Sequence, residues 1–167
     1  LHSFPTRRSS DLFSKSCSAP VRVHRVSTTD SNSTDVLTPF ELPYGGHNAS
    51  PLYVQDKKIL LTFDTNNRKT GAWRFNGAGD FEELWVHDIA NSNQVLYYPN
   101  TGEVVLDDVL DDKTVDAVVI DIETGEEKGR TATGTRYPAA MAFYPGLNRD
   151  CYSTSGVEGV LYRVFVS

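Results

Sequence analysis

The feature that most constrains the fold of this chain is a repeat of about 45 residues. Three segments carry it, each followed by a polar turn and a second apolar stretch: "SPLYV" at 50–54, "VLYYP" at 95–99 and "MAFYP" at 141–145. Within them, Val54, Tyr98 and Tyr144 are separated by 44 and 46 residues. Repeats of this length are typical of folds built from consecutive, similar modules.

A second landmark keeps the same period further along each repeat. Ala72, Ala117 and Leu161 occupy like positions in apolar stretches and are separated by 45 and 44 residues. A repeat of about 45 residues that contains four short strands is typical of a β-propeller blade, whose sheet buries its faces against neighbouring blades. We therefore predict an all-β chain, a β-propeller fragment of about three blades, each a four-stranded antiparallel sheet.

Short apolar or alternating stretches, bounded by polar turn residues, predict thirteen strands and no helix. The predicted strands are 21–26, 36–42, 51–54, 59–63, 71–75, 83–86, 94–98, 103–107, 116–122, 127–131, 140–144, 150–153 and 160–166. They assign two strands to a first blade, four each to the next two, and three to the last. In the closed rings of many propellers, a strand from the N-terminal part of the chain completes the last blade.

The first twelve residues, "LHSFPTRRSSDL", share no pattern with the rest of the chain. They match the translation of a common short-read sequencing adapter at every codon from Leu1 to Asp11, and partially at Leu12. We interpret residues 1–12 as an adapter-derived, disordered artefact and 13–167 as a partial propeller domain. On this interpretation the native start and any signal peptide are missing, and with them the rest of the propeller.

Two stretches resemble the repeat of the pyrroloquinoline-quinone-like, or quinoprotein-type, β-propellers. "AVVIDIETGE" at 117–126 has that repeat's strand and Thr-Gly turn, and "AWRFNGAGDFEELW" at 72–85 places Trp85 at its docking-tryptophan position. The second full blade departs from the pattern, with Lys128 and Gly129 where the tryptophan would fall. The resemblance implies a propeller with an extracytoplasmic or secreted location; a quinone cofactor is not required by the sequence, and the cofactor stays unknown.

Charge argues against a nucleic-acid partner. The chain has 16 basic and 22 acidic residues, a net charge of −6, and its basic residues are scattered rather than clustered. No apolar run approaches the roughly 20 residues that span a bilayer, so no membrane span is expected. Cys17 and Cys151 could pair as a disulfide or remain two ordinary thiols.

The loops that lead into the innermost strand of each blade predict one candidate ligand site. Ligands of propellers usually lie at one end of the central channel, where these loops converge. The loops place His47, Asn91, and Arg136 or Tyr137 at matching positions in successive blades. Such a ring could bind a small anion, a sugar or a metal; the alternative is that these polar side chains cap strands and turns.

The densest acidic cluster, "DDVLDDKTVD", predicts a weaker candidate for a metal site. It supplies Asp107, Asp108, Asp111 and Asp112, with Asp116 close behind. Calcium prefers several oxygen ligands, but the spacing lacks the EF-hand pattern, and acidic turns are commonly just solvated.

No nucleophile elbow, dinucleotide fingerprint or P-loop is present, so the sequence offers no catalytic motif. The primary hypothesis is therefore an uncharacterised propeller module that binds a small molecule or a protein and is not an enzyme. The alternative is part of a propeller enzyme, a lactonase-like hydrolase or a quinoprotein dehydrogenase.

Overall fold

The structure is a computed structural model. It describes residues 20–26, 29, 33–41, 51–77, 80–91, 95–136, 143–145, 150–155 and 159–166. Residues 1–12, Cys17, His47 and Tyr137 lie outside the described residues.

The described residues contain thirteen strands and no helix, which confirms the predicted all-β class. They form four antiparallel sheets. Sheet I contains β1 (Val23–Val26) and β2 (Ser33–Leu37). Sheet II contains β3 (Leu52–Val54), β4 (Ile59–Asp64), β5 (Lys69–Phe75) and β6 (Phe81–His87). Sheet III contains β7 (Leu96–Tyr98), β8 (Glu103–Val109), β9 (Thr114–Asp121) and β10 (Glu127–Arg136). Sheet IV contains β11 (Phe143–Pro145), β12 (Asp150–Ser155) and β13 (Val160–Phe165).

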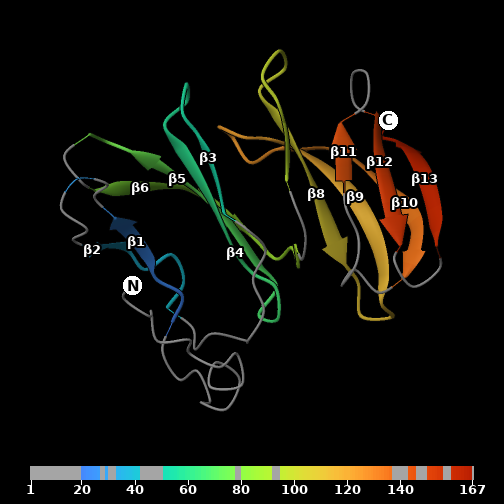
Figure 1. Cartoon of the computed structure of the whole chain (residues 1–167), viewed down its shortest axis with the longest axis horizontal. Helices are drawn as coiled ribbons and strands as arrows, with labels where there is room; N and C mark the ends of the chain where they lie inside the picture. The colour runs from blue at the N-terminus through green and yellow to red at the C-terminus, as the bar shows by residue number, and fades with distance from the viewer. Residues whose placement is uncertain are drawn as a thin grey trace, which may run out of the picture.

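The sheets follow one another in chain order along an arc, with the N- and C-terminal sheets at opposite ends (Figure 1). Each strand pairs with the next in sequence within its sheet, so the sheets are meanders, and sheets II, III and IV each start with a strand of three residues. This is the architecture of consecutive β-propeller blades, as the repeat predicted. The described residues include no helix of the length and apolarity that a membrane crossing requires.

Two of the predicted strands differ from the structure by five residues at one end. The strand predicted at 36–42 is β2, which ends at Leu37, because Pro39 has no N–H to donate to a ladder. The strand predicted at 127–131 continues to Arg136, with register irregularities on both sides of its central ladder. Such register irregularities are β-bulges. They let a strand continue through small and polar residues, which a strict alternation of apolar and polar residues does not identify as a strand.

The apolar core lies between the sheets rather than within any one of them. One cluster joins sheets II and III, with Leu61 and Ala72 on one side and Val118 and Ile120 on the other, all 0% exposed. A second cluster joins sheets III and IV across Ala117, Val119 and other apolar side chains. Alternate residues of β9 face opposite neighbours, which explains the uninterrupted apolar run at 117–120.

Trp85 connects sheet II to sheet III at the rim of this core. Its indole Nε1 donates a hydrogen bond of 3.0 Å to the Ile122 carbonyl oxygen, and its ring covers the turn at Gly125. His87 lies at 5.1 Å from the Trp85 ring, centroid to centroid, and its Nε2 is 2.7 Å from the Gly125 carbonyl oxygen. The Trp85 position and the Thr-Gly turn singled out in the sequence therefore meet across a blade junction.

Cys151 carries a free, fully buried thiol in the core between sheets III and IV. Burial raises its pKa to about 11, so little thiolate forms at neutral pH. In a Cys17→Ser variant, we expect iodoacetamide at pH 8 to leave Cys151 unmodified in the folded chain and to alkylate it in urea. Mass spectrometry measures both rates; equal rates with and without urea would contradict the burial of this thiol.

Candidate functional site

Two turns and one connection gather at the same end of sheets II and III. They are the β4–β5 turn, the β8–β9 turn and the connection from β6 to β7, and antiparallel pairing places all three at this end. A pocket of about 170 Å³ lies between them. It is lined by Thr65, Asn66, Arg68, Ala90, Val109, Leu110, Asp111 and Lys113. Most of these residues are polar or charged, so the pocket suits a small polar molecule.

Arg68 and Lys113 occupy the same turn position in consecutive blades. Each immediately precedes the third strand of its sheet, and both have a left-handed backbone, with φ of 53° and 67°. In sheet IV the residue at that position is Gly159, with φ of 66°. Because glycine avoids the cost of about 1 kcal/mol that other residues carry in this conformation, a basic residue here needs a separate reason.

The Arg68 side chain is held in place across the blade junction. Its Nη1 donates to the Val109 carbonyl oxygen at 2.6 Å, and its Nη2 donates to Oδ1 of Asp108 at 3.1 Å. Nη2 also lies 3.4 Å from the Asp88 carbonyl oxygen. An arginine fixed in this way presents its charge to the pocket without losing much further side-chain entropy.

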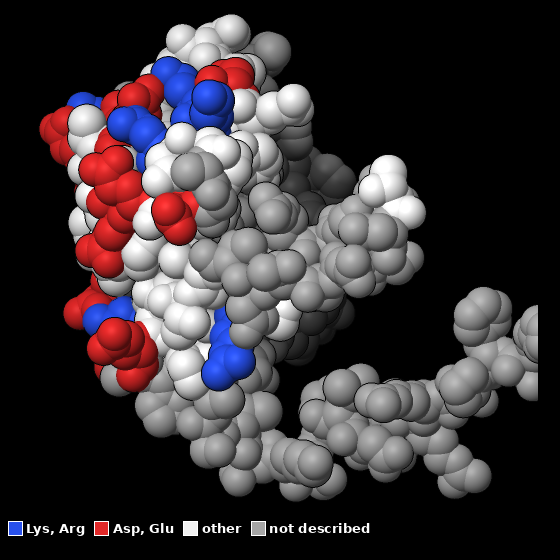
Figure 2. Space-filling view, turned by 90° about the vertical axis from the view of Figure 1, so that its left-hand side faces the viewer, with Lys and Arg blue, Asp and Glu red and all other residues white. Residues whose placement is uncertain are grey.

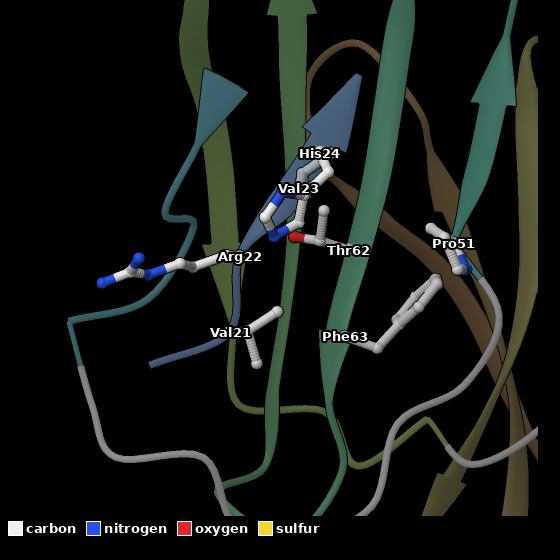
Figure 3. Close-up of a pocket in the computed structure, with 7 residues that line it drawn as sticks. All are labelled: Val21, Arg22, Val23, His24, Pro51, Thr62 and Phe63. Atoms are coloured by element: carbon white, nitrogen blue, oxygen red, sulfur yellow. The ribbon is translucent and has the colours of Figure 1, made fainter. Parts of the chain in front are cut away.

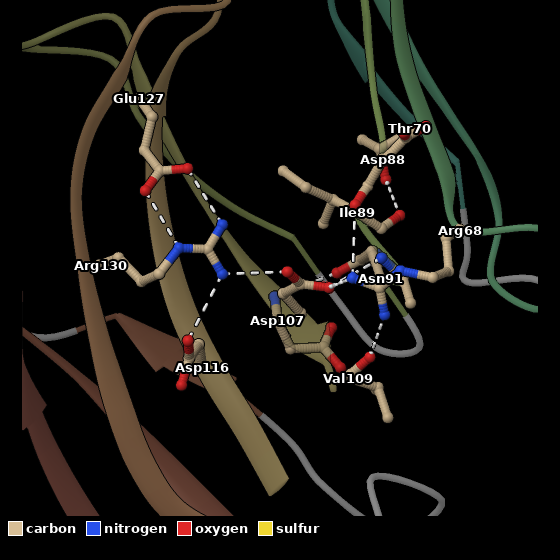
Figure 4. A network of polar contacts seen from close by, with 12 residues as sticks. Arg68, Thr70, Asp88, Ile89, Asn91, Asp107, Val109, Asp116, Glu127 and Arg130 are labelled. Atoms are coloured by element: carbon tan, nitrogen blue, oxygen red, sulfur yellow. Dashed lines mark hydrogen bonds and ion pairs between the residues drawn. The ribbon is translucent and has the colours of Figure 1, made fainter. Parts of the chain in front are cut away.

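Asp108 joins Arg68 and Arg130 in a polar network next to the pocket. Figure 4 shows these two arginines, with Glu127 and Asp116 beside Arg130. The Asp108 side chain is 4% exposed, and its Oδ1 also accepts a 3.0 Å hydrogen bond from the Ala90 backbone N–H. Oδ2 accepts from Nη1 of Arg130 at 2.9 Å. One buried carboxylate thereby joins two arginines and the backbone of the β6–β7 connection. These contacts fix the wall of the pocket that Arg68 and Ala90 form.

Arg130 is itself surrounded by carboxylates. Glu127 receives hydrogen bonds from its Nε and Nη2, both at 3.0 Å, and Asp116 lies at 3.4 Å from Nη1. The hydrogen bonds from Arg130 hold the pKa of Glu127 below its usual range. Because this pKa is lower in the folded chain, the contribution of Glu127 to stability is present at neutral pH and lost on acidification.

Asn91, one of the predicted ligand residues, lies in the β6–β7 connection next to this network. It is 0% exposed; its side-chain Oδ1 accepts from the Asp107 backbone N–H at 3.2 Å, and its carbonyl oxygen accepts from the Thr65 hydroxyl. Arg136 is the last residue of β10, at the same end of the sheets. Since His47 and Tyr137 lie outside the described residues, the structure does not assemble the predicted ring, which stays a prediction.

The four aspartates of the predicted metal site are distributed over a strand and a turn. Asp107 and Asp108 are buried in β8, so the alternative of a solvated acidic turn does not describe these two residues. Asp111 and Asp112 are exposed in the β8–β9 turn, and Oδ1 of Asp112 accepts from the Thr114 backbone N–H at 2.9 Å. The described part of the chain holds no group of three or more His, Cys, Asp or Glu arranged to bind a metal ion.

A second pocket, of about 310 Å³, lies at the same end between sheets I and II (Figure 3). It is lined by Val21, Arg22, Val23, His24, Pro51, Thr62 and Phe63. The Arg22 side chain points away from Thr62 and Phe63 in Figure 3. The walls of the pocket between β1 and β4 are therefore largely apolar. This pocket therefore lacks the converging charged groups of the pocket between sheets II and III.

Acidic side chains dominate the exposed edge of the face in Figure 2, and the basic side chains gather mainly in its upper part. Arg68 and Lys113 line the same pocket on a chain of net charge −6. Sequence reasoning missed Arg68 and Lys113. A signal existed, because "TNNR" at 65–68 and "LDDK" at 110–113 align once the period is applied to the second turn of each blade.

No protein-family model matches the chain, and no curated protein is similar to it in sequence. Solved structures match its fold. A protein from Lactobacillus plantarum is 15% identical, with a TM-score of 0.50 over 87% of this chain and 50% of that one. A putative 6-phosphogluconolactonase from Bacteroides fragilis is 15% identical, with a TM-score of 0.50 over 84% of this chain and 46% of that one.

A periplasmic gluconolactonase from Pseudomonas aeruginosa is 16% identical, with a TM-score of 0.49 over 79% of this chain and 41% of that one. The chain thus spans half or less of the length of these solved structures. The first two matches agree with the propeller architecture described above, and at this identity the likeness concerns the fold alone.

Proposed function

We propose that this chain is part of a β-propeller that binds a small anionic molecule, such as a phosphorylated or carboxylated sugar, between sheets II and III. The observation that carries the proposal is the pair Arg68 and Lys113, which occupy equivalent left-handed turn positions and line one pocket. Asp111 is the only acidic residue among the described residues that line it, and the carboxylate of Asp108 pairs with Arg130 as well as with Arg68. Two cations within a polar pocket favour an anionic ligand with hydroxyl groups.

Calorimetric titration of the full chain with glucose 6-phosphate, and with glucose as the uncharged counterpart, tests this proposal. We expect only the phosphorylated sugar to bind, and Lys113→Ala to weaken binding about tenfold or more, because a charge-assisted hydrogen bond is lost. Lys58→Ala is the matched control. Lys58 has the same left-handed backbone, with φ of 55°, but lies in the β3–β4 turn at the opposite end of sheet II.

Equal weakening by both variants would attribute the effect to the turn backbone and contradict the proposal. Equal affinity for glucose and glucose 6-phosphate would remove the role of the two cations. Binding should also weaken as salt is raised, since the attraction between exposed charges is screened.

A lactonase-like hydrolase is the second candidate function. The Bacteroides fragilis protein that shares the fold at a TM-score of 0.50 is a putative 6-phosphogluconolactonase, and a phosphorylated lactone is a ligand of the proposed class. In such a reaction Asp111 would accept a proton from the attacking water and return it to the ring oxygen as the lactone opens. One of the two cations would stabilise the carbonyl oxygen while the other holds the phosphate. Hydrolysis of 6-phosphogluconolactone by the full chain, measured beside the titrations, distinguishes an enzyme from a binding module. Membership of the quinoprotein-type repeat family and an extracytoplasmic location also remain proposals, supported by the repeat resemblance.

A further inference from the structure

A basic residue recurs at one place in the repeat of three consecutive sheets. β1, β5 and β9 begin 46 and 45 residues apart, and the residue immediately before each of them is Arg22, Arg68 or Lys113. In sheet IV the same place, before β13, is occupied by Gly159. The period that arranges the strands therefore also arranges a row of positive charge, and we call Arg22, Arg68 and Lys113 the cation row.

The three residues of the cation row lie at the same end of their sheets. Arg22 lines the pocket between sheets I and II together with Pro51 and Phe63. Phe63 is next to the last residue of β4, so it lies beside the β4–β5 turn that ends at Arg68. Antiparallel pairing places the β8–β9 turn, which ends at Lys113, at this end too. Arg22 and Lys113 are exposed, and the Arg22 side chain points away from Phe63 in Figure 3.

The spacing of the sheets determines how long a ligand must be to contact the whole cation row. Facing β-sheets pack about 10 Å apart, so a ligand that spans three sheets must extend over roughly 20 Å. A single sugar bound between Arg68 and Lys113 does not reach Arg22. An elongated ligand with repeated negative charges contacts all three residues, and its affinity rises steeply because the later contacts are made within one complex.

The pocket between two of these cations favours hydroxyl groups as well as negative charge. The Asp111 carboxylate accepts hydrogen bonds from hydroxyl donors, and the Asn66 amide both donates and accepts; both residues line the pocket and are exposed. Each unit of an acidic oligosaccharide carries several hydroxyls beside its one carboxylate. An acidic peptide carries carboxylates with few hydroxyls, so Asp111 would repel it without a compensating hydrogen bond.

We propose that the cation row binds an acidic oligosaccharide with one carboxylate per sugar, which extends from the pocket between sheets II and III toward sheet I. This proposal rests on the proposed function, because Arg68 and Lys113 belong to both sites, and it lengthens the ligand from one sugar to several. Gly159 ends the row, since it brings no charge to sheet IV.

Calorimetric titration of the full chain with galacturonate, with a galacturonate hexamer and with uncharged maltohexaose tests this proposal. We expect the hexamer to bind at least about a hundredfold more tightly than the monomer, and maltohexaose not to bind. Arg22→Ala should weaken binding of the hexamer about tenfold and leave binding of the monomer unchanged, because one sugar does not reach sheet I. Lys58→Ala, at the opposite end of sheet II, is the matched control and should change neither affinity.

Gly159→Lys tests the same row by extending it. The φ of Gly159 is 66°, close to the 53° and 67° of Arg68 and Lys113, and a Cβ there would meet nothing within 4 Å. A lysine at this place should strengthen binding of a galacturonate oligomer long enough to reach sheet IV by about tenfold. Gly102→Lys is the control, because it adds the same charge at a φ of 71° in the β7–β8 turn, at the opposite end of sheet III.

A hexamer that binds no more tightly than galacturonate would overturn the proposal and leave the proposed small-molecule function intact. Equally tight binding of hexaglutamate would overturn the assignment to a sugar. If neither galacturonate nor glucose 6-phosphate binds but the hexamer does, the proposed function is overturned and the cation row is supported. Protection of Cys151 from alkylation reports that each variant is folded.

Discussion

Gly125→Ala is expected to lower the free energy of unfolding by about 3–5 kcal/mol, comparable to the loss of a buried tryptophan. A Cβ atom at this position would lie 2.6 Å from Cγ and 2.9 Å from Cβ of Trp85. Such contacts are too close for atoms that cannot move away, so the indole would have to leave the turn. Its hydrogen bond to the Ile122 carbonyl oxygen would be lost with it. Gly125 also has a φ of 75°, which adds backbone strain.

Gly102→Ala is the control that separates these two costs. Gly102 has a φ of 71°, yet a Cβ there would meet nothing within 4 Å. Gly102→Ala should therefore lower the free energy of unfolding by only about 1 kcal/mol, which is the cost of the left-handed backbone conformation. Urea unfolding followed by circular dichroism measures both variants. If Gly102→Ala is as destabilising as Gly125→Ala, the close packing of Trp85 on the turn is not the cause.

A double-mutant cycle with Trp85→Ala provides a second check. Once the indole is removed, Gly125→Ala should cost little more than Gly102→Ala, because the clash has no partner. If the stability losses of Trp85→Ala and Gly125→Ala simply add in the double variant, the two residues are not in contact, and the proposed packing between sheets II and III is contradicted.

Asp108→Ala is expected to destabilise the chain by about 2–3 kcal/mol. Breaking a buried ion pair commonly costs about 3–5 kcal/mol, because the remaining charge is left without its partner. The cost is lower here because Arg68 and Arg130 are about one-third exposed, and Arg130 keeps its bonds to Glu127. The Ala90 N–H would also lose its acceptor. Chemical unfolding measures the effect, with Glu82→Ala on the exposed outer strand β6 as a control that should change stability by less than about 0.5 kcal/mol.

Asp108→Ala should also weaken binding of glucose 6-phosphate, because Arg68 loses the contact that orients it. Unchanged stability would show that the two arginines and the Ala90 N–H are adequately solvated without the carboxylate. The network would then not be what fixes the wall of the pocket.

The repeat and the strand order could be predicted because they depend on local patterns. Polar turns such as Glu123-Thr124-Gly125 end strands because their residues favour a chain reversal. Apolar stretches such as 117–120 indicate a strand that is buried on both faces, and this conclusion does not require knowing which sheets cover it. The strand predicted at 36–42 lies too far along the sequence, because its apolar pattern continues past Pro39, whereas β2 ends before this proline. The family resemblance singled out the Trp85 position and the turn that contains Gly125, but their contact was not predicted, since nothing local to either residue specifies the partner.

The candidate site could not be predicted to the same extent. Arg68 and Asp108 are 40 residues apart, and their contact depends on how one blade is rotated against the next. Asp107 and Asp108 belong to an acidic segment whose composition is equally compatible with a solvated loop. The burial of Asp108 depends on hydrogen-bond donors, the Ala90 N–H and two guanidinium groups, that only the assembled junction supplies.

The indole of Trp85 also determines where this chain can be divided. The sequence repeat places a boundary between β6 and β7, but the tryptophan of one repeat completes its hydrogen bonding and packing only in the next. Cutting the chain at that boundary would leave the Trp85 side chain exposed to water on one piece. It would also uncover the turn at Gly125 on the other piece. The smallest autonomously folding piece is therefore expected to straddle two repeats, and limited proteolysis should release sheets II and III together rather than one by one.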